Sequence, residues 1–170
     1  MPSVTLHRVE PARRETIANM MQLYIHDFSE WWRGQPSGEL EEDGRFSPYE
    51  HLDSYWSDAS REPWLIRVEG SLAGFALLNR VTHSGQPADW NMAEFFVVRK
   101  HRGGGVGTAA VHAILAGHPG QWELAIARKN LPAQSFWPRA VGAAPGVFAI
   151  EPLDLSDERW NGPVLRFRIG

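Results

Sequence analysis

A cluster of glycines at 103–107 stands between a run rich in Phe and Val and an apolar stretch with helical spacing. The segment AEFFVVRKHRGGGVGT (93–108) predicts a strand, a basic turn and a glycine loop that leads directly into a helix. Glycine allows backbone N–H groups to crowd together and a ligand to approach them closely. The helix adds unpaired N–H groups and the positive end of its dipole. The segment therefore predicts an anion-binding loop, which Arg99, Lys100 and Arg102 would strengthen.

Three kinds of phosphate site compete for this loop. A P-loop requires GxxxxGK[ST], and no lysine follows any glycine of the chain, which excludes it. The segment GVGTAA (105–110) matches the dinucleotide fingerprint GxGxxG/A. However, Ala127, Arg128 and Lys129 stand where an acid should end the next strand, and residues 129–170 are too few for the rest of a doubly wound sheet. The third kind is a coenzyme A pyrophosphate site.

The hydrophobic pattern predicts a mixed α/β chain. Strands are expected at 4–9, 64–68, 72–78, 90–98, 122–127, 147–150 and 164–169. Helices are expected at 11–28, 48–56 and 109–116, and from 131 onward behind a cap at Asn130, where Pro138 should kink or end the last one. The stretch 32–47, rich in Gly, Pro and acids, predicts a surface loop.

Length and composition restrict the class of protein. A chain of 170 residues with 43% hydrophobic and 22% charged residues predicts one globular domain over 1–170. Without cysteine, disulfides, a thiolate nucleophile and a Cys-based zinc site are excluded. The longest apolar run, 72–78, is too short to span a bilayer, and the N-terminus lacks the long apolar region of a signal peptide. We therefore expect a cytoplasmic protein with no membrane contact.

The distribution of charge and the spacing of histidines restrict the classes of ligand that the chain is expected to bind. Residues 1–60 hold eleven acids and five bases, whereas residues 61–170 hold nine acids and twelve bases. One part of the chain is thus expected to favour cations and the other anions. A net charge of −3 argues against a nucleic-acid binder. The seven histidines show no HxxxH or HExxH spacing, so no metal is expected.

Two motifs resemble one family. The loop Arg102-Gly103-Gly104-Gly105-Val106-Gly107 is similar to the [R/Q]xxGx[G/A] loop of the GNAT superfamily of N-acetyltransferases. NLPAQSFW (130–137) resembles the NxxAxxFY segment that follows the fifth strand of that family. The predicted order of elements agrees with the GNAT core along the whole chain. The resemblance implies an α/β fold with a mixed central sheet of about seven strands, about four flanking helices, and a V-shaped splay between the strands expected at 90–98 and 122–127.

The resemblance also implies acetyl-CoA, the acyl donor, in this V. Main-chain groups of Phe96, Val97 and Val98 would pair with the pantetheine arm, and Asn130 would contact the same arm. A main-chain N–H near Val97 or Val98 would polarise the acyl carbonyl. The pyrophosphate would be held by Arg102 and by the N–H groups of Gly103, Gly104, Gly105, Val106, Gly107 and Thr108.

One position departs from the family's pattern. Where the family often has a proton-donating tyrosine, this chain has Trp137, whose indole N–H has no useful acidity near neutral pH. The departure leaves the implied cofactor site intact but puts tyrosine-assisted release of the thiol in doubt. We therefore expect Trp137 to form a wall of the cofactor cleft.

Candidate catalytic and acceptor residues follow. Glu94 is the candidate base, because burial among Phe and Val should raise its pKa toward neutrality. Its alternative role is a strand carboxylate that bonds to an arginine or faces water. Asp27, Glu30 and Trp31 form an acidic and aromatic cluster with Trp32. The family places this region over the acceptor, so the cluster is expected to receive a cationic amine; alternatively it is a helix end that packs tryptophans against the sheet.

The predicted function is direct transfer of an acetyl group to a primary amine, with a small molecule as the preferred acceptor. An amino acid, an antibiotic and a protein N-terminus also fit the sequence. The alternative function is a non-catalytic sensor or partner module that binds acyl-CoA. A homodimer through the late strands stays open.

Overall fold

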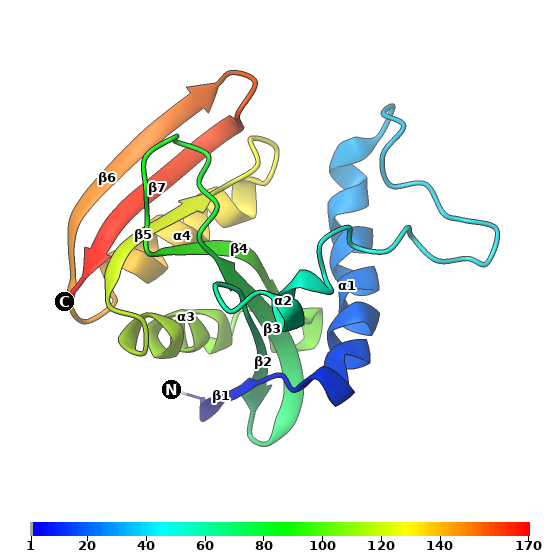
Figure 1. The fold of residues 1–170 in the computed structure, drawn as a ribbon, viewed down its shortest axis with the longest axis horizontal. Helices are drawn as coiled ribbons and strands as arrows, with labels where there is room; N and C mark the ends of the chain where they lie inside the picture. Colours follow the sequence, from blue (N-terminus) through cyan, green and yellow to red (C-terminus); the bar gives the residue numbers. More distant parts are fainter. Residues whose placement is uncertain (1) are drawn as a thin grey trace.

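The computed structural model describes residues 2–170, which form one mixed sheet with helices on both faces (Figure 1). The strand order is β1-β2-β3-β4-β5-β7-β6, and every neighbouring pair is antiparallel except β4 and β5. The strands are β1 (Val4–Arg8), β2 (Glu62–Val68), β3 (Ser71–Asn79), β4 (Trp90–Val97), β5 (Gly120–Ala125), β6 (Val147–Ser156) and β7 (Asn161–Ile169). The α-helices are α1 (Arg14–Ser29), α2 (Ser54–Ser57), α3 (Val106–Ala116) and α4 (Leu131–Gly142). The predicted fold class is confirmed.

The sheet is buried on both faces. Leu78 of β3 packs with Trp122 and with α3 and α4, whereas Leu77 packs on the other face with α1 and α2. Successive side chains of a strand point to opposite faces, so a strand covered on both sides is apolar throughout. The sequence SLAGFALLN of β3 has this composition between its terminal Ser71 and Asn79.

β4 and β5 lie together only at their starts. Trp90 pairs with Trp122 and Asn91 with Glu123, after which the two strands diverge. On the other side of β4, Leu78 opposes Met92 and Leu77 opposes Glu94, so Ala93 has no opposite residue. Such a one-residue bulge bends a strand and increases its local twist. The predicted V-shaped splay is therefore present, and it opens next to the bulge.

Several element boundaries differ from the prediction. The helix expected at 48–56 is reduced to Ser54–Ser57, because the preceding hydrogen bonds, such as Leu52 N to Tyr49 O, span three residues and form turns. α3 begins at Val106, since Gly105 is its N-cap residue. β6 continues to Ser156 through Pro152, which an edge strand tolerates because one side of its backbone has no neighbouring strand.

α4 also differs from the prediction, because it runs through Pro138 to Gly142 without ending there. The predicted cap is confirmed: Asn130 Oδ1 accepts a hydrogen bond of 3.1 Å from Ala133 N. Within residues 2–170, no helix combines the length and the hydropathy that crossing a membrane requires.

Candidate active site

An outer cleft of about 830 Å³ lies where β4 and β5 diverge, between the end of α1 and the starts of α3 and α4. Most residues that the sequence assigned to acetyl-CoA line this cleft: Phe96, Val97, Arg102, Gly103, Gly105, Gly107, Thr108, Asn130 and Trp137. Val98, Gly104 and Val106 do not line it. The Val106 side chain is buried instead in the core beside Ile66 and Ala110.

The glycine loop has the geometry of an anion cradle. Gly103 and Gly105 adopt φ of 79° and 82°, a left-handed conformation that favours glycine. The first hydrogen bond at the start of α3 runs from Ala109 N to Gly105 O. The N–H groups of the helix's first turn therefore have no partner inside the helix and are available to a ligand.

Only some of the main-chain groups that the sequence assigned to the cofactor face the cleft. Val98 N donates to Ala73 O at 2.8 Å, so this N–H is used by the sheet. Because peptide groups alternate along a strand, the N–H of Val97 points the other way, toward the cleft. The Val97 carbonyl, on the same side, accepts a hydrogen bond of 2.6 Å from Arg102 Nε.

Asp27 has cationic partners within the protein. Its Oδ1 pairs with Arg99 Nη2 at 2.8 Å, and its Oδ2 pairs with Arg102 Nη2. Partial burial would raise the pKa of Asp27, but the hydrogen bonds from Arg102 and Arg99 outweigh it and hold the pKa below its ordinary value. Asp27, Glu30 and Trp31 line the outer cleft beside the glycine loop, because the last turn of α1 faces this loop. The structure thus does not bring the predicted acceptor cluster to Glu94.

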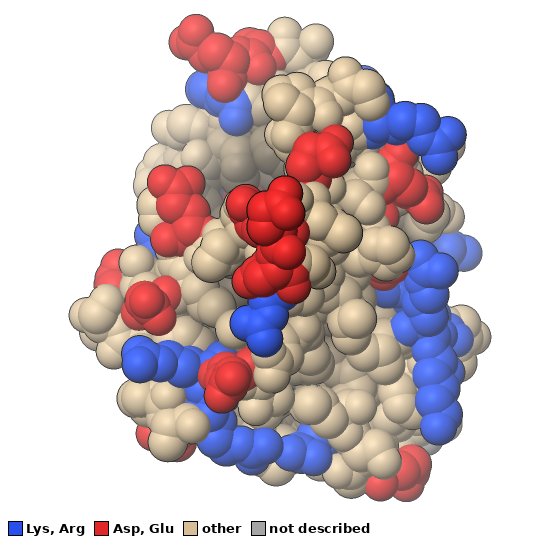
Figure 2. Space-filling model, turned by 90° about the vertical axis from the view of Figure 1, so that its right-hand side faces the viewer, with Lys and Arg blue, Asp and Glu red and all other residues tan. Residues whose placement is uncertain are grey.

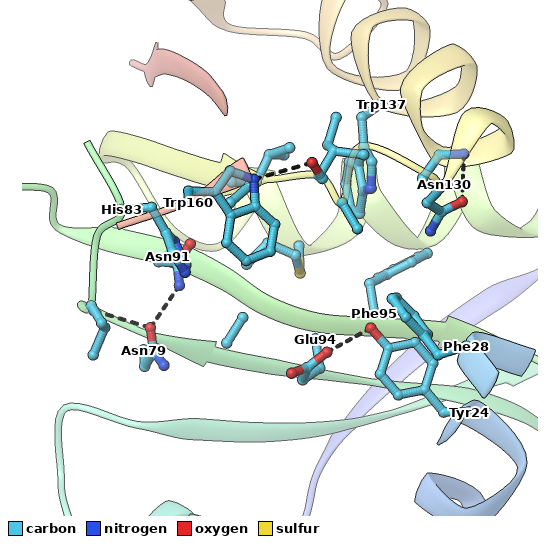
Figure 3. A pocket seen from close by; sticks show the side chains of 18 of the residues that line it. Tyr24, Phe28, Asn79, His83, Asn91, Glu94, Phe95, Asn130, Trp137 and Trp160 are labelled. Atoms are coloured by element: carbon cyan, nitrogen blue, oxygen red, sulfur yellow. Dashed lines mark hydrogen bonds between the residues drawn. The ribbon is translucent and has the colours of Figure 1, made fainter. Parts of the chain in front are cut away.

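An inner pocket of about 450 Å³ adjoins the outer cleft (Figure 3). Both spaces share a boundary of aromatic and small residues: Tyr24, Phe28, Phe95, Asn130, Ala133 and Trp137. Trp137 is 8% exposed and packs edge-on against Phe95, with ring centroids 5.2 Å apart. Its place at this boundary agrees with the role of a wall.

Glu94 lines the inner pocket and is held by two tyrosines. Its Oε2 accepts a hydrogen bond of 2.5 Å from Tyr24, and its Oε1 accepts one of 2.8 Å from Tyr49 (Figure 3 shows the first). Burial raises the pKa of Glu94, and the two hydrogen bonds offset only part of this effect. Burial and the nearby Glu94 also raise the pKa of Tyr24, so this phenol stays a hydrogen-bond donor. Glu94 is thus a half-buried carboxylate whose pKa lies above its ordinary value, and its partners are tyrosines rather than arginines.

The opposite end of the inner pocket is polar. Asn91 Nδ2 donates to Asn79 Oδ1 at 2.9 Å, and His83 packs against Trp160 with ring centroids 4.6 Å apart (Figure 3). Sequence reasoning missed these residues. The one local signal that could have revealed them is Asn79, an asparagine at the end of the largely apolar strand β3.

A comparison with family models decides the family. The model described as the acetyltransferase (GNAT) family matches residues 18–143. The chain belongs to this family. The predicted activity of an acetyltransferase is thereby confirmed at the level of the family, and the match includes both motifs found in the sequence.

Solved acetyltransferase structures share the fold at low sequence identity. An acetyltransferase from Thermus thermophilus has a TM-score of 0.66 and 15% identity, with all of both chains covered. Spermidine N-acetyltransferase from Vibrio cholerae, in complex with CoA and spermine, has a TM-score of 0.57 and 15% identity over 98% of this chain and 94% of that one. The ribosomal-protein-S18-alanine N-acetyltransferase from Escherichia coli has a TM-score of 0.56 and 11% identity over 98% and 93%. A comparison with curated proteins gave no match.

Proposed function

We propose that this acetyltransferase transfers an acetyl group from acetyl-CoA directly to the primary amine of a small molecule. The observation that carries the proposal is the position of Glu94, a half-buried carboxylate in an inner pocket that adjoins the outer cleft. A carboxylate with a raised pKa is suited to accept a proton from an ammonium group near neutral pH.

The outer cleft suits acetyl-CoA, which supplies an acyl group bound to sulfur. The free N–H groups at the start of α3, together with Arg99 and Arg102, would hold the phosphates. The amide of Asn130 and the N–H of Val97 face the space for the pantetheine arm. Arg99 and Arg102 are paired with Asp27 in this structure, so phosphate binding would compete with that carboxylate.

The chain's own residues can remove the proton from the acceptor ammonium. Glu94 takes the proton from the acceptor ammonium, Tyr24 and Tyr49 hold its carboxylate in place, and the freed amine forms a bond to the acyl carbon as the bond to sulfur breaks. The thiol has a pKa near the ~8.5 of a free cysteine, so it can leave as a thiolate and take up the proton that the acylated nitrogen loses, without a protein acid. Trp137 therefore needs no part in proton transfer.

The size of the inner pocket supports a small acceptor. One solved neighbour is named for spermidine and another for the alanine of a ribosomal protein, so the fold alone leaves the acceptor open. Figure 2 shows acidic side chains over the face that carries α1 and the loop after it; the exposed acids of that loop are Glu39, Glu41, Glu42, Asp43 and Glu50. They line neither pocket, so a purely cationic acceptor stays a prediction with little local support.

The test is acetyl-CoA-dependent release of free thiol with a panel of primary amines, followed by mass spectrometry of the products. We expect acetylated small amines and no transfer to neutral alcohols. Binding of acetyl-CoA without thiol release by any amine would instead favour the non-catalytic acyl-CoA sensor.

Other assignments also stay proposals. We propose one domain over residues 1–170 and a cytoplasmic location. A homodimer would use the sheet edge, where β6 exposes 51% of Phe148 and 46% of Ile150. Light scattering of the purified chain tests this last assignment.

A further inference from the structure

The walls of the inner pocket carry opposite charges. Among the described residues that line it, Glu94 is the one carboxylate and Arg61 the one guanidinium. Arg61 immediately precedes β2, next to Tyr55 of α2, whose ring lies 5.4 Å from the centre of the guanidinium. The chemistry proposed above uses Glu94 and leaves Arg61 without a role.

Arg61 is short of partners for a side chain that is only 19% exposed. Its ion pair with Asp58 is made through Nε at 3.4 Å, a long contact. Asp58 Oδ1 is occupied by the N–H of Ser60 at 2.8 Å and by its hydroxyl at 2.7 Å. The Tyr55 hydroxyl also interacts with the guanidinium, but within residues 2–170 no hydrogen bond from the two Nη nitrogens has ordinary geometry.

We propose that the acceptor carries a carboxylate as well as its amine, and that Arg61 binds this carboxylate while Glu94 takes the proton of the amine. This inference rests on the proposed function, because it specifies the acceptor of the same site. The two Nη groups of a guanidinium match the two oxygens of a carboxylate, and such charge-assisted bonds are shorter and stronger than the loose contacts that Arg61 makes with Asp58 and Tyr55.

The charges disfavour polyamines, the competing class of acceptor. A polyamine would bring a second ammonium toward the guanidinium of Arg61, and like charges repel more strongly away from bulk water. A carboxylate gives the half-buried guanidinium a partner, which lowers the cost of its partial burial. A pocket of about 450 Å³ accommodates an amino acid of modest length. Arg61 would thus select zwitterions over diamines.

The experiment compares three matched series of acceptors: linear ω-amino acids of three to six carbons, their primary amides, and the diamines of equal length. We expect the wild type to have the highest kcat/KM for one of the amino acids. In Arg61→Gln, kcat/KM for that amino acid should fall about tenfold or more, as for other truncated charge pairs, while the value for its neutral amide should fall much less. Arg61→Lys should recover part of the loss.

A second variant separates ligand binding from structural support. Asp58→Asn breaks the same ion pair but leaves the guanidinium in the pocket, so it should keep the preference for the carboxylate. If Arg61 only stabilises the turn before β2, then Asp58→Asn and Arg61→Gln will lower the melting temperature and all kcat/KM values alike. That result, or a wild type that prefers amides or diamines, overturns the proposal.

A binding measurement keeps the inference independent of turnover. Calorimetric titration of 5-aminopentanoate into the protein saturated with CoA should give heat in the wild type and none in Arg61→Gln. Equal binding in both proteins, or none in the wild type, contradicts the assignment of Arg61. Absence of thiol release together with Arg61-dependent binding would contradict the proposed transfer and leave the carboxylate site standing.

Discussion

Glu94 is the residue whose protonation should control the rate. Burial raises its pKa, so the acidic limb of the kcat/KM profile should lie above the ordinary range of a glutamate, which is about 4.3. Glu94→Gln keeps the shape and removes the base, and kcat should fall on the order of a hundredfold while the acidic limb disappears. Glu10→Gln, at an exposed position outside both pockets, is the matched control. A wild-type pH profile in Glu94→Gln would return Glu94 to a structural role.

Trp137 should act by filling space at the boundary of the two pockets. Trp137→Phe keeps an aromatic ring against Phe95, so most of the activity should remain, and Trp137→Tyr should give at most a modest gain. Trp137→Ala opens the boundary, so it should weaken acetyl-CoA binding and cost about 3–5 kcal/mol of stability. Steady-state kinetics and urea unfolding measure both effects. A Phe variant that binds acetyl-CoA normally but turns over a hundredfold more slowly would show that the indole takes part in the chemistry.

At the scale of elements, the glycine loop before α3 should lose affinity for acetyl-CoA when a side chain blocks access to its backbone N–H groups. Gly105→Val places a branched side chain at the mouth of the cradle, so acetyl-CoA affinity measured by calorimetry should fall tenfold or more. The left-handed backbone adds a strain of about 1–2 kcal/mol. Gly34→Val is the control, because Gly34 has φ of 79° with open space around it and lines neither pocket. Equal affinity in Gly105→Val and Gly34→Val would remove the loop from the cofactor site.

The same elements show what a sequence reveals about a site. The glycine loop and the Asn130 cap are short contiguous segments, so their residues and their geometry could be predicted together. The partners of Glu94 could not, because Tyr24 and Tyr49 lie 70 and 45 residues away in sequence and meet it only through packing of α1 and of the turn before α2. The surroundings of the acidic cluster at the end of α1 could not be predicted for the same reason, because no local pattern shows that Asp27 faces Arg99; its role toward the acceptor stays a prediction.

At the scale of the whole molecule, one buried ion pair joins the late strands to the rim of the inner pocket. Glu123 of β5 is fully buried and accepts hydrogen bonds from Arg166 Nη1 at 2.6 Å and from the N–H of His83 at 2.6 Å. Burial opposes its ionisation, but the hydrogen bonds from Ser84, His83 and Arg166 outweigh it and lower the pKa of Glu123. Hydrogen bonds to Glu123 of β5 thus hold the loop that carries His83 against the sheet.

This pair makes stability depend on pH. A lowered carboxyl pKa contributes stability that is present above the unfolded value of about 4.3 and is lost as pH falls through the folded value. Glu123→Gln leaves Arg166 buried without a counter-charge, so unfolding at pH 7 should require about 3–5 kcal/mol less. The loss of stability toward acid pH should also become shallower. Urea unfolding at several pH values, with exposed Glu158→Gln as the control, measures both. Parallel pH curves for Glu123→Gln and the wild type would contradict this account.

The unopposed Ala93 in β4 has a consequence for how such a sheet can arise. Leu78 pairs with Met92 and Leu77 pairs with Glu94 on either side of Ala93. Deletion of Ala93 would therefore leave a regular ladder, in which Met92 and Glu94 stay on opposite faces of the sheet. The bend would be lost, and β4 would be free to stay in register with β5 along its length. One extra residue in β4 would thus separate a closed sheet from one with an unpaired inner edge, along which an extended molecule could bond as a strand does.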